Sequence, residues 1–178
     1  PKHDATGVSE KIKARLVANG KQQDKNLYQD RSSPTAMLES IMAVLVIAAH
    51  EQRQMAGLDI GSAYVKVEWV GEPVHIVMEE RLVTLLVNEY HEHGPYRRSD
   101  GTLIMRLLKA LNGALIARKL WFNKLTGVLS RLGFAANELD TCVMNETFKG
   151  NQLTSVVVYV DDILATNKDL TTDPSTEI

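Results

Sequence analysis

The sequence predicts an α+β fold, in which strands gather beside two long helices instead of alternating strictly with them. Apolar residues recur at helical spacing over 34–53 and again over 109–132. A run rich in Val and Ile over 156–165 is interrupted by Asp161 and Asp162, and aspartates favour turns over strands. This run therefore predicts a β-hairpin that carries both carboxylates at its tip.

The N-terminal part predicts a strand with a cationic face. We expect 1–10 to form a flexible lead-in, and 11–18 alternates apolar and charged residues as a half-exposed strand does. The alternation places Lys13 and Arg15 on one face, and Asn19-Gly20 is a strong turn signal directly after it. Such a face can hold a phosphate or simply be solvated, and these residues alone leave both possibilities open.

The first helix is expected to begin at Ser33-Pro34, because Ser caps helices and Pro is tolerated at the first helical position. Its methionines are expected to fill the core. The next strand is expected to end at Asp59, because Gly61 and Ser62 break the strand pattern. An aspartate at that place can cap a helix, form an internal salt bridge, or bind a metal ion beside the hairpin carboxylates.

The remaining elements follow from the same kinds of signal. Gly133 is expected to end the second helix, and Gly113 near its start indicates a close approach of another backbone segment. The sequence at 91–93, His-Glu-His, lacks the spacing of a zinc site, so we expect a surface loop. The other predicted elements are strands at 74–78, 102–108 and 141–147, a short helix at 81–90, a turn at 149–151 and a disordered tail at 168–178.

Composition is that of an ordinary globular domain, with 44% apolar and 24% charged residues. The net charge of −2 gives no general basic field, so any surface for nucleic acid must be local. No apolar run reaches membrane-spanning length and the N-terminus is unlike a signal peptide, so we expect no membrane partner and no secretion. Cys142, the single cysteine, is expected to be a buried, unreactive thiol.

Taken in order, five segments resemble the reverse transcriptase of copia-type retrotransposons. They are 13–20 (Lys-Ala-Arg-Leu-Val-Ala-Asn-Gly), 33–34 (Ser-Pro), 58–65 (Leu-Asp-Ile-Gly-Ser-Ala-Tyr-Val), 133–143 (Gly-Phe and later Asp-Thr-Cys-Val) and 159–162 (Tyr-Val-Asp-Asp). The resemblance covers 11–167, which we expect to form one domain. It implies a right-hand polymerase with N-terminal fingers and with a palm made of an antiparallel sheet backed by helices.

The resemblance also implies RNA-directed DNA synthesis from dNTPs, on a primed RNA or DNA template, with two Mg²⁺ ions that Mn²⁺ can replace. It assigns Asp59 and Asp161 to the metal ions and to catalysis, with Asp162 as a further catalytic carboxylate. Tyr159 belongs to the same hairpin signature. Two ions about 3.5–4 Å apart activate the primer 3′-hydroxyl and stabilise the leaving pyrophosphate in such sites.

Nucleotide binding is assigned by the same resemblance. Tyr64 matches the aromatic residue that stacks beneath the deoxyribose and excludes a 2′-hydroxyl. Lys13 and Arg15 match the residues that hold the triphosphate, a role that their cationic strand face already permits.

The segment 111–121 departs from the family pattern Leu-Tyr-Gly-Leu-Lys-Gln-Ala-Pro-Arg-x-Trp. Ile116 stands at the Gln expected to contact the nucleotide and Leu115 at the Lys before it, and apolar side chains cannot replace those hydrogen bonds. The thumb and RNase H segments that follow the hairpin in the family are missing from this chain. We therefore expect little polymerase activity from the chain alone, and expect Ile116→Gln to raise primer extension once downstream segments are present.

Three functions stay open at this stage. The leading one is a reverse transcriptase fragment acting in the cytoplasm, inside an element particle, or in the nucleus. The second is a drifted, inactive remnant that keeps the fold and binds nucleic acid. The third is an unrelated α+β interaction domain with a chance Asp-Asp turn.

Overall fold

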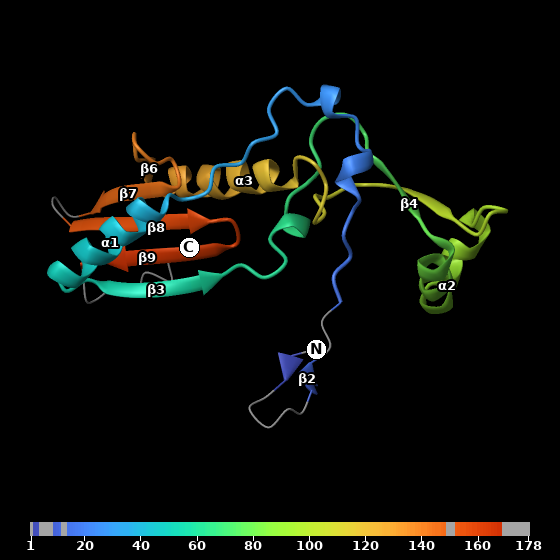
Figure 1. Cartoon of the computed structure of the whole chain (residues 1–178), viewed down its shortest axis with the longest axis horizontal. Coiled ribbons are helices and arrows are strands. Elements are labelled where there is room, and N and C mark those ends of the chain that lie inside the picture. The colour runs from blue at the N-terminus through green and yellow to red at the C-terminus, as the bar shows by residue number, and fades with distance from the viewer. Residues whose placement is uncertain (1, 4–8, 12–13, 149–151, 169–178) are drawn as a thin grey trace.

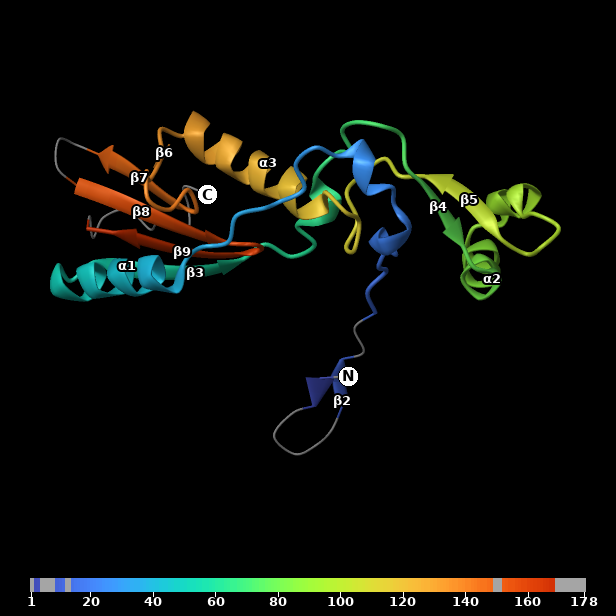
Figure 2. The ribbon, with the colours of Figure 1, turned by 45° about the horizontal axis from the view of Figure 1, so that its top comes forward.

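The largest unit of the molecule is a five-stranded antiparallel sheet with one helix on each face (Figure 1, Figure 2). The computed structural model describes residues 2–3, 9–11, 14–148 and 152–168. The strand order is β3-β9-β8-β7-β6. The predicted mixture of helices with an antiparallel sheet is confirmed. The elements are α1 (Leu38–His50), β3 (Gln54–Asp59), α3 (Ala117–Arg131), β6 (Ala135–Ala136), β7 (Val143–Phe148), β8 (Gln152–Tyr159) and β9 (Asp162–Asn167).

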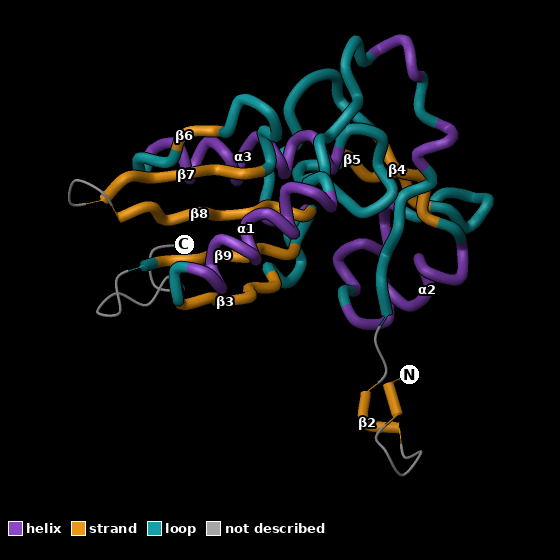
Figure 3. Tube along the Cα trace, turned by 60° about the vertical axis from the view of Figure 1, so that its left-hand side comes forward, coloured by secondary structure: helices purple, strands orange, loops and turns teal. Residues whose placement is uncertain are grey.

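The two-residue period of a strand decides which side chains each helix covers. In β8, Val156 and Val158 are buried in one cluster with Trp121 of α3. Val157, between them, is buried in a second cluster with Val44 of α1. Figure 3 shows α1 running along the sheet beside β8 and β9. Because both faces of β8 are dry, its sequence is a continuous apolar run instead of an alternating one.

A smaller unit lies beyond the start of α3 (Figure 1). It pairs two antiparallel strands beside helix α2, as the sequence predicted for 74–78, 102–108 and 81–90. Two further short strands pair within the segment predicted as a lead-in. None of the helices among the described residues is long and apolar enough to cross a membrane. The elements are β1 (Lys2–His3), β2 (Ser9–Lys11), β4 (His75–Met78), α2 (Glu80–Glu89) and β5 (Leu103–Arg106), with 3₁₀ turns η1 (Gly20–Gln22), η2 (Lys25–Leu27), η3 (Tyr64–Lys66) and η4 (His91–Tyr96).

Helix α1 begins at Leu38, so the predicted start at Ser33-Pro34 is wrong. The cap is supplied from a distant loop: Asp140 Oδ2 accepts a hydrogen bond from the Met37 N–H at 2.9 Å. Asp140 Oδ1 accepts another from the Cys142 N–H at 2.9 Å. Burial alone would raise the pKa of Asp140, but these hydrogen bonds outweigh it and lower that pKa below its ordinary value. One buried carboxylate thus joins α1 to the start of β7.

The prediction of a buried, unreactive Cys142 is confirmed. Its side chain is fully buried. Burial, together with the negative charge of Asp140, raises the pKa of the thiol to about 11. Because the thiolate is the nucleophilic form, this cysteine is unsuited to covalent catalysis.

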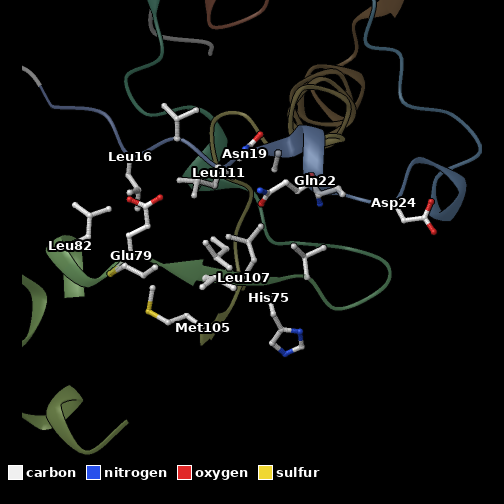
Figure 4. Close-up of a pocket in the computed structure, with 18 of the residues that line it drawn as sticks. Leu16, Asn19, Gln22, Asp24, His75, Glu79, Leu82, Met105, Leu107 and Leu111 are labelled. Atoms are coloured by element: carbon white, nitrogen blue, oxygen red, sulfur yellow. The ribbon is translucent and has the colours of Figure 1, made fainter. Parts of the chain in front are cut away.

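The predicted strand at 11–18 is wrong over its later part, because 14–18 form no strand. The Ala18 N–H donates to Asn112 O at 2.7 Å, but Asn112 lies in a loop, so no ladder develops from this contact. Leu16 instead borders a pocket of about 510 Å³ between this segment and the β4–β5 pair (Figure 4). Val17, Ala18 and Asn19 line the same pocket, so the alternation in the sequence does not correspond to two faces of a strand.

Both long helices are shorter than the sequence predicted. Helix α3 begins at Ala117 and not at 109, because the loop before it turns back at Gly113.

Helix α1 packs through Val44 and Ala48, whereas Met42 is 54% exposed, so the prediction that its methionines fill the core is wrong. Apolar residues occur almost all round α1, so the sequence pattern does not indicate which face of the helix packs on the sheet.

Gly20 and Gly113 mark the place where two backbone segments cross. A Cβ on Gly20 would lie 2.1 Å from Gly113 O, and a Cβ on Gly113 would lie 2.1 Å from Ala18 O. Gly113 also has a φ of +84°, a conformation that favours glycine. Beside the crossing, the Leu115 N–H donates to Gln23 Oε1 at 2.6 Å. The predicted close backbone approach at Gly113 is confirmed.

We expect Gly113→Ala to lower the free energy of unfolding by about 3 kcal/mol or more, because the new methyl group would overlap a backbone carbonyl at positive φ. The matched control is Gly127→Ala in α3, where a Cβ meets nothing within 4 Å. That change should stabilise the helix by roughly 0.5–1 kcal/mol. Urea unfolding measures both variants, and equal midpoints would contradict the crossing.

Candidate active site

The hairpin between β8 and β9 brings three aspartates to one end of the sheet. In the register, Tyr159 faces Asp162 across the hairpin, and Asp59 at the end of β3 faces Asp162 from the other side. Asp161 lies in the connecting turn, and its carbonyl accepts the Ile60 N–H at 3.0 Å. The predicted hairpin, with its carboxylates at the tip, is present as expected.

Asp59 and Asp161 line one cavity of about 290 Å³, here called the carboxylate cavity. Arg15 and Tyr64 line it as well. The Asp59 side chain is exposed and that of Asp161 is partly buried. Among the described residues, neither carboxylate makes a hydrogen bond or an ion pair with another side chain. Two neighbouring carboxylates are thus left available to a ligand.

This pair fits one or two small, hard cations. Mg²⁺ keeps several waters, and proteins usually bind it through one or two carboxylates together with substrate phosphates. Within the part of the chain that the structure describes, no group of three or more His, Cys, Asp or Glu side chains is placed to hold a metal ion. Asp59 and Asp161 are therefore the carboxylates of this cavity that could hold such an ion.

A second, larger hollow of about 1200 Å³ adjoins the first and shares Arg15, Tyr64 and Asp161 with it. We call it the cationic cleft. Its positive side chains come from three separate parts of the chain. They are Arg15, Lys21, Lys25, Arg31 and Arg118. A carboxylate cavity therefore opens into a cleft with an excess of positive charge, the arrangement expected for a phosphate-bearing ligand held against a metal ion.

The family model described as reverse transcriptase (RNA-dependent DNA polymerase) matches residues 1–173. The chain belongs to this family. This match confirms the leading prediction from the sequence at the level of family. Three of the five segments that resembled a reverse transcriptase, 13–20, 58–65 and 159–162, contribute residues to the lining of the carboxylate cavity. The reverse transcriptase match also removes the third candidate, an unrelated interaction domain.

Three curated relatives are Pol polyproteins of plant transposons. The chain is 29% identical to the retrovirus-related Pol polyprotein from transposon RE1 of Arabidopsis thaliana, over 96% of this chain and 11% of the relative. It is 26% identical to that from transposon TNT 1-94 of Nicotiana tabacum, over 89% and 11%. It is 29% identical to that from transposon RE2 of Arabidopsis thaliana, over 94% and 11%. The chain therefore spans about a tenth of these relatives. No solved structure matches it.

Two of the other predicted site residues, Tyr159 and Asp162, fall outside the two hollows. Asp162 is exposed at the first position of β9 and lines neither of them. Tyr159 is 49% exposed and also lines neither. Lys13 lies outside the described residues. The structure brings together Asp59, Asp161, Tyr64 and Arg15, and leaves the roles of the others as predictions from the resemblance.

Four of the five cations in the cleft were not predicted from the sequence. Lys21, Lys25 and Arg31 lie in a polar loop with no periodic pattern, and Arg118 lies in the first turn of α3. They meet only because the loop at 20–31 crosses the start of α3. The available signal was the clustering of positive charge directly after the Asn19-Gly20 turn.

Ile116 is placed differently from what the resemblance implied. Its side chain is 7% exposed and lies just before α3, and it does not line the cationic cleft. Arg118, two residues later, lines the cleft instead. A charged side chain therefore lines the cleft two residues after the buried Ile116.

Tyr64 lies between the two hollows, in the 3₁₀ turn after β3. Burial raises the pKa of its phenol, the positive charge of Arg118 acts to lower it, and the negative charge of Asp161 raises it further. The phenol therefore stays neutral at physiological pH, and it lies close enough to both charged groups for their charges to affect its pKa.

Trp121 of α3 holds the hairpin turn. Its indole Nε1–H donates to Val160 O at 2.6 Å. Val160 has a φ of 60°, which is unfavourable for a β-branched residue. A hydrogen bond from a buried, rigid donor offsets part of this backbone strain and fixes the place of Asp161, the next residue.

We expect Trp121→Phe to lower the free energy of unfolding by about 1–3 kcal/mol, because the Val160 carbonyl loses its donor. The variant should also speed amide hydrogen exchange at Asp161 and Asp162. Trp69→Phe is the matched control, since the indole of Trp69 donates at 2.9 Å to the exposed Glu72 carbonyl, which water can reach. Unchanged stability and exchange in Trp121→Phe would show that the indole does not hold the turn.

Proposed function

We propose that the domain catalyses template-directed DNA synthesis from dNTPs, using divalent metal ions held by Asp59 and Asp161. The observation that carries the proposal is that these two carboxylates, from the end of β3 and from the hairpin turn, line one cavity without other polar partners among the described residues. Family membership supports this function. The use of a template and a primer, and the remaining polymerase segments, are part of what we propose, because the chain spans only 11% of the length of this relative.

In this proposal the chain's residues act mainly by positioning. When bound, two divalent ions activate the primer 3′-hydroxyl and stabilise the leaving pyrophosphate. Asp59 and Asp161 would hold them, and exposed Asp162 would add negative charge at the same end of the sheet. Tyr64 would pack beneath the sugar, and Arg15 would hold the triphosphate. Rates in such reactions depend steeply on geometry, with about 1 Å of misplacement costing ~10²-fold.

The fold supports assigning the two units to palm and fingers. The five-stranded sheet carries the carboxylates and would be the palm. The segment at 14–31, together with β4 and β5, would belong to the fingers. Their contact at the Gly20–Gly113 crossing would set the width of the nucleotide site between them.

A drifted domain that binds phosphates but no longer catalyses is the second candidate. Ile116 and Leu115 favour it, because both replace polar residues of the family pattern. The two candidates differ in whether primer extension accompanies binding.

We expect the chain to bind Mn²⁺ weakly without nucleotide, because such ions normally borrow phosphate ligands. Asp161→Asn and Asp59→Asn should each lose most of this binding, since one of two ligands is neutralised. The paramagnetic resonance signal of free Mn²⁺ measures it, with Glu138→Gln on an exposed loop as control. Identical binding in wild type and Asp161→Asn would remove these residues from the metal site.

We expect Tyr64→Val to admit ribonucleotides, because the smaller side chain would no longer block a 2′-hydroxyl. The measurement is the ratio of kcat/KM for dNTP and rNTP in a chain extended with the downstream polymerase segments. Val70→Ala, at an exposed valine (65%) that lines neither hollow, is the control. If the ratio is unchanged in Tyr64→Val, the tyrosine only fills space between the two hollows.

A further inference from the structure

Two neighbouring cations at the start of α3 have different surroundings. Lys119 forms an ion pair with Asp30, and its hydrogen bond, helped by those from Ser32, lowers the pKa of Asp30 to about 2. Arg118 is exposed, and its guanidinium makes no hydrogen bond or ion pair within the part of the chain that the structure describes. Its backbone carbonyl accepts a hydrogen bond from the Ser33 hydroxyl at 3.4 Å. One cation is used to dock the loop, and the other faces the cleft.

The place of Arg118 in the cleft is next to the candidate reaction centre. It lines the same hollow as Tyr64 and Asp161. Its positive charge acts to lower the pKa of the Tyr64 phenol and the negative charge of Asp161 acts to raise it, so both charged groups lie near this phenol. An anion bound to Arg118 would therefore lie beside the carboxylate cavity and not at a remote part of the surface.

The rest of the cleft strengthens its preference for a polyanion. Arg15, Lys21, Lys25 and Arg31 also have no ion-pair partner among the described residues. Of the two carboxylates in the lining, Asp30 is already paired with Lys119, and Asp161 lies where the cleft meets the carboxylate cavity. Five positive side chains that share one hollow repel each other, and a ligand with several phosphates relieves that repulsion. The chain as a whole has a net charge of −2, so this concentration of positive charge is local.

We propose that Arg118 positions the triphosphate of the incoming nucleotide, in place of the polar contact that is missing at the buried Ile116. The inference rests on the proposed polymerase function. Arginine suits the role, because its planar fork binds phosphate oxygens in pairs and it stays charged at any physiological pH. Its position on α3 also suits the role, since Trp121 of the same helix holds the turn that carries Asp161. Arg118 is in this view a positioning residue that keeps the phosphates in register with the metal carboxylates.

The test is calorimetric titration of the 178-residue chain with inorganic tripolyphosphate and with Mg²⁺–dTTP. Hydrogen bonds to charged groups are strong enough that we expect Arg118→Ala to weaken both affinities by about tenfold or more. Arg118→Lys should keep the charge and recover part of the loss. Lys124→Ala, an exposed cation of α3 outside the cleft, is the matched control and should bind as wild type does. Thermal unfolding of each variant confirms that the fold is kept.

A single-stranded oligothymidylate is titrated in parallel. It distinguishes whether Arg118 binds the phosphates of a nucleotide triphosphate or those of a nucleic-acid strand. We expect its affinity to change less than about twofold in Arg118→Ala. Equal tripolyphosphate binding by wild type and Arg118→Ala would overturn the inference, as would a loss confined to the oligonucleotide. If tripolyphosphate binding depends on Arg118 while an extended chain makes no DNA, Arg118 binds phosphate but does not position an incoming nucleotide, and the proposed polymerase function fails.

Discussion

The crossing of the backbone at Gly20 and Gly113 is the constraint on which both hollows depend. The two segments approach so closely that neither glycine has room for a Cβ. This contact places the loop at 20–31 over the start of α3, and with it the cations that line the cleft. A wider crossing would separate Lys21 and Arg31 from Arg118 and leave no shared site. The chemistry of the cleft is thus set by a packing requirement that involves no charged residue.

Helix α3 contacts both the loop that carries the cations and the hairpin turn that carries Asp161. At its first turn it meets the segment 20–33, through the Lys119–Asp30 ion pair and the hydrogen bond from the Ser33 hydroxyl to the Arg118 carbonyl. One turn later, Trp121 holds the strained hairpin residue Val160. The carboxylates and the cations are therefore fixed to one rigid element, although they come from distant parts of the sequence. Such common support is what a reaction governed by positioning requires.

Local patterns predicted the parts of the site that depend on local geometry. The hairpin at 156–165 and the strand ending at Asp59 follow from apolar runs that meet turn residues, and the structure has both. The start of α1 was missed because its cap, Asp140, lies 103 residues from Met37 in the sequence. The cations of the cleft were missed for the same reason, since Lys25 and Arg118 share no pattern. Chain crossings create such groups, and no periodicity within either segment reveals them.

The two hollows make opposite electrostatic demands that one kind of ligand satisfies together. Asp59 and Asp161, unpaired at one end of the sheet, favour a divalent cation. The adjoining cleft, with five positive side chains, favours an anion of several charges. A simple metal ion would leave the cleft unsatisfied, and a simple anion would be repelled by the carboxylates. In the proposed function, a nucleotide triphosphate that carries its own divalent ions would meet both demands, and Tyr64, which lines both hollows, would lie beside its sugar.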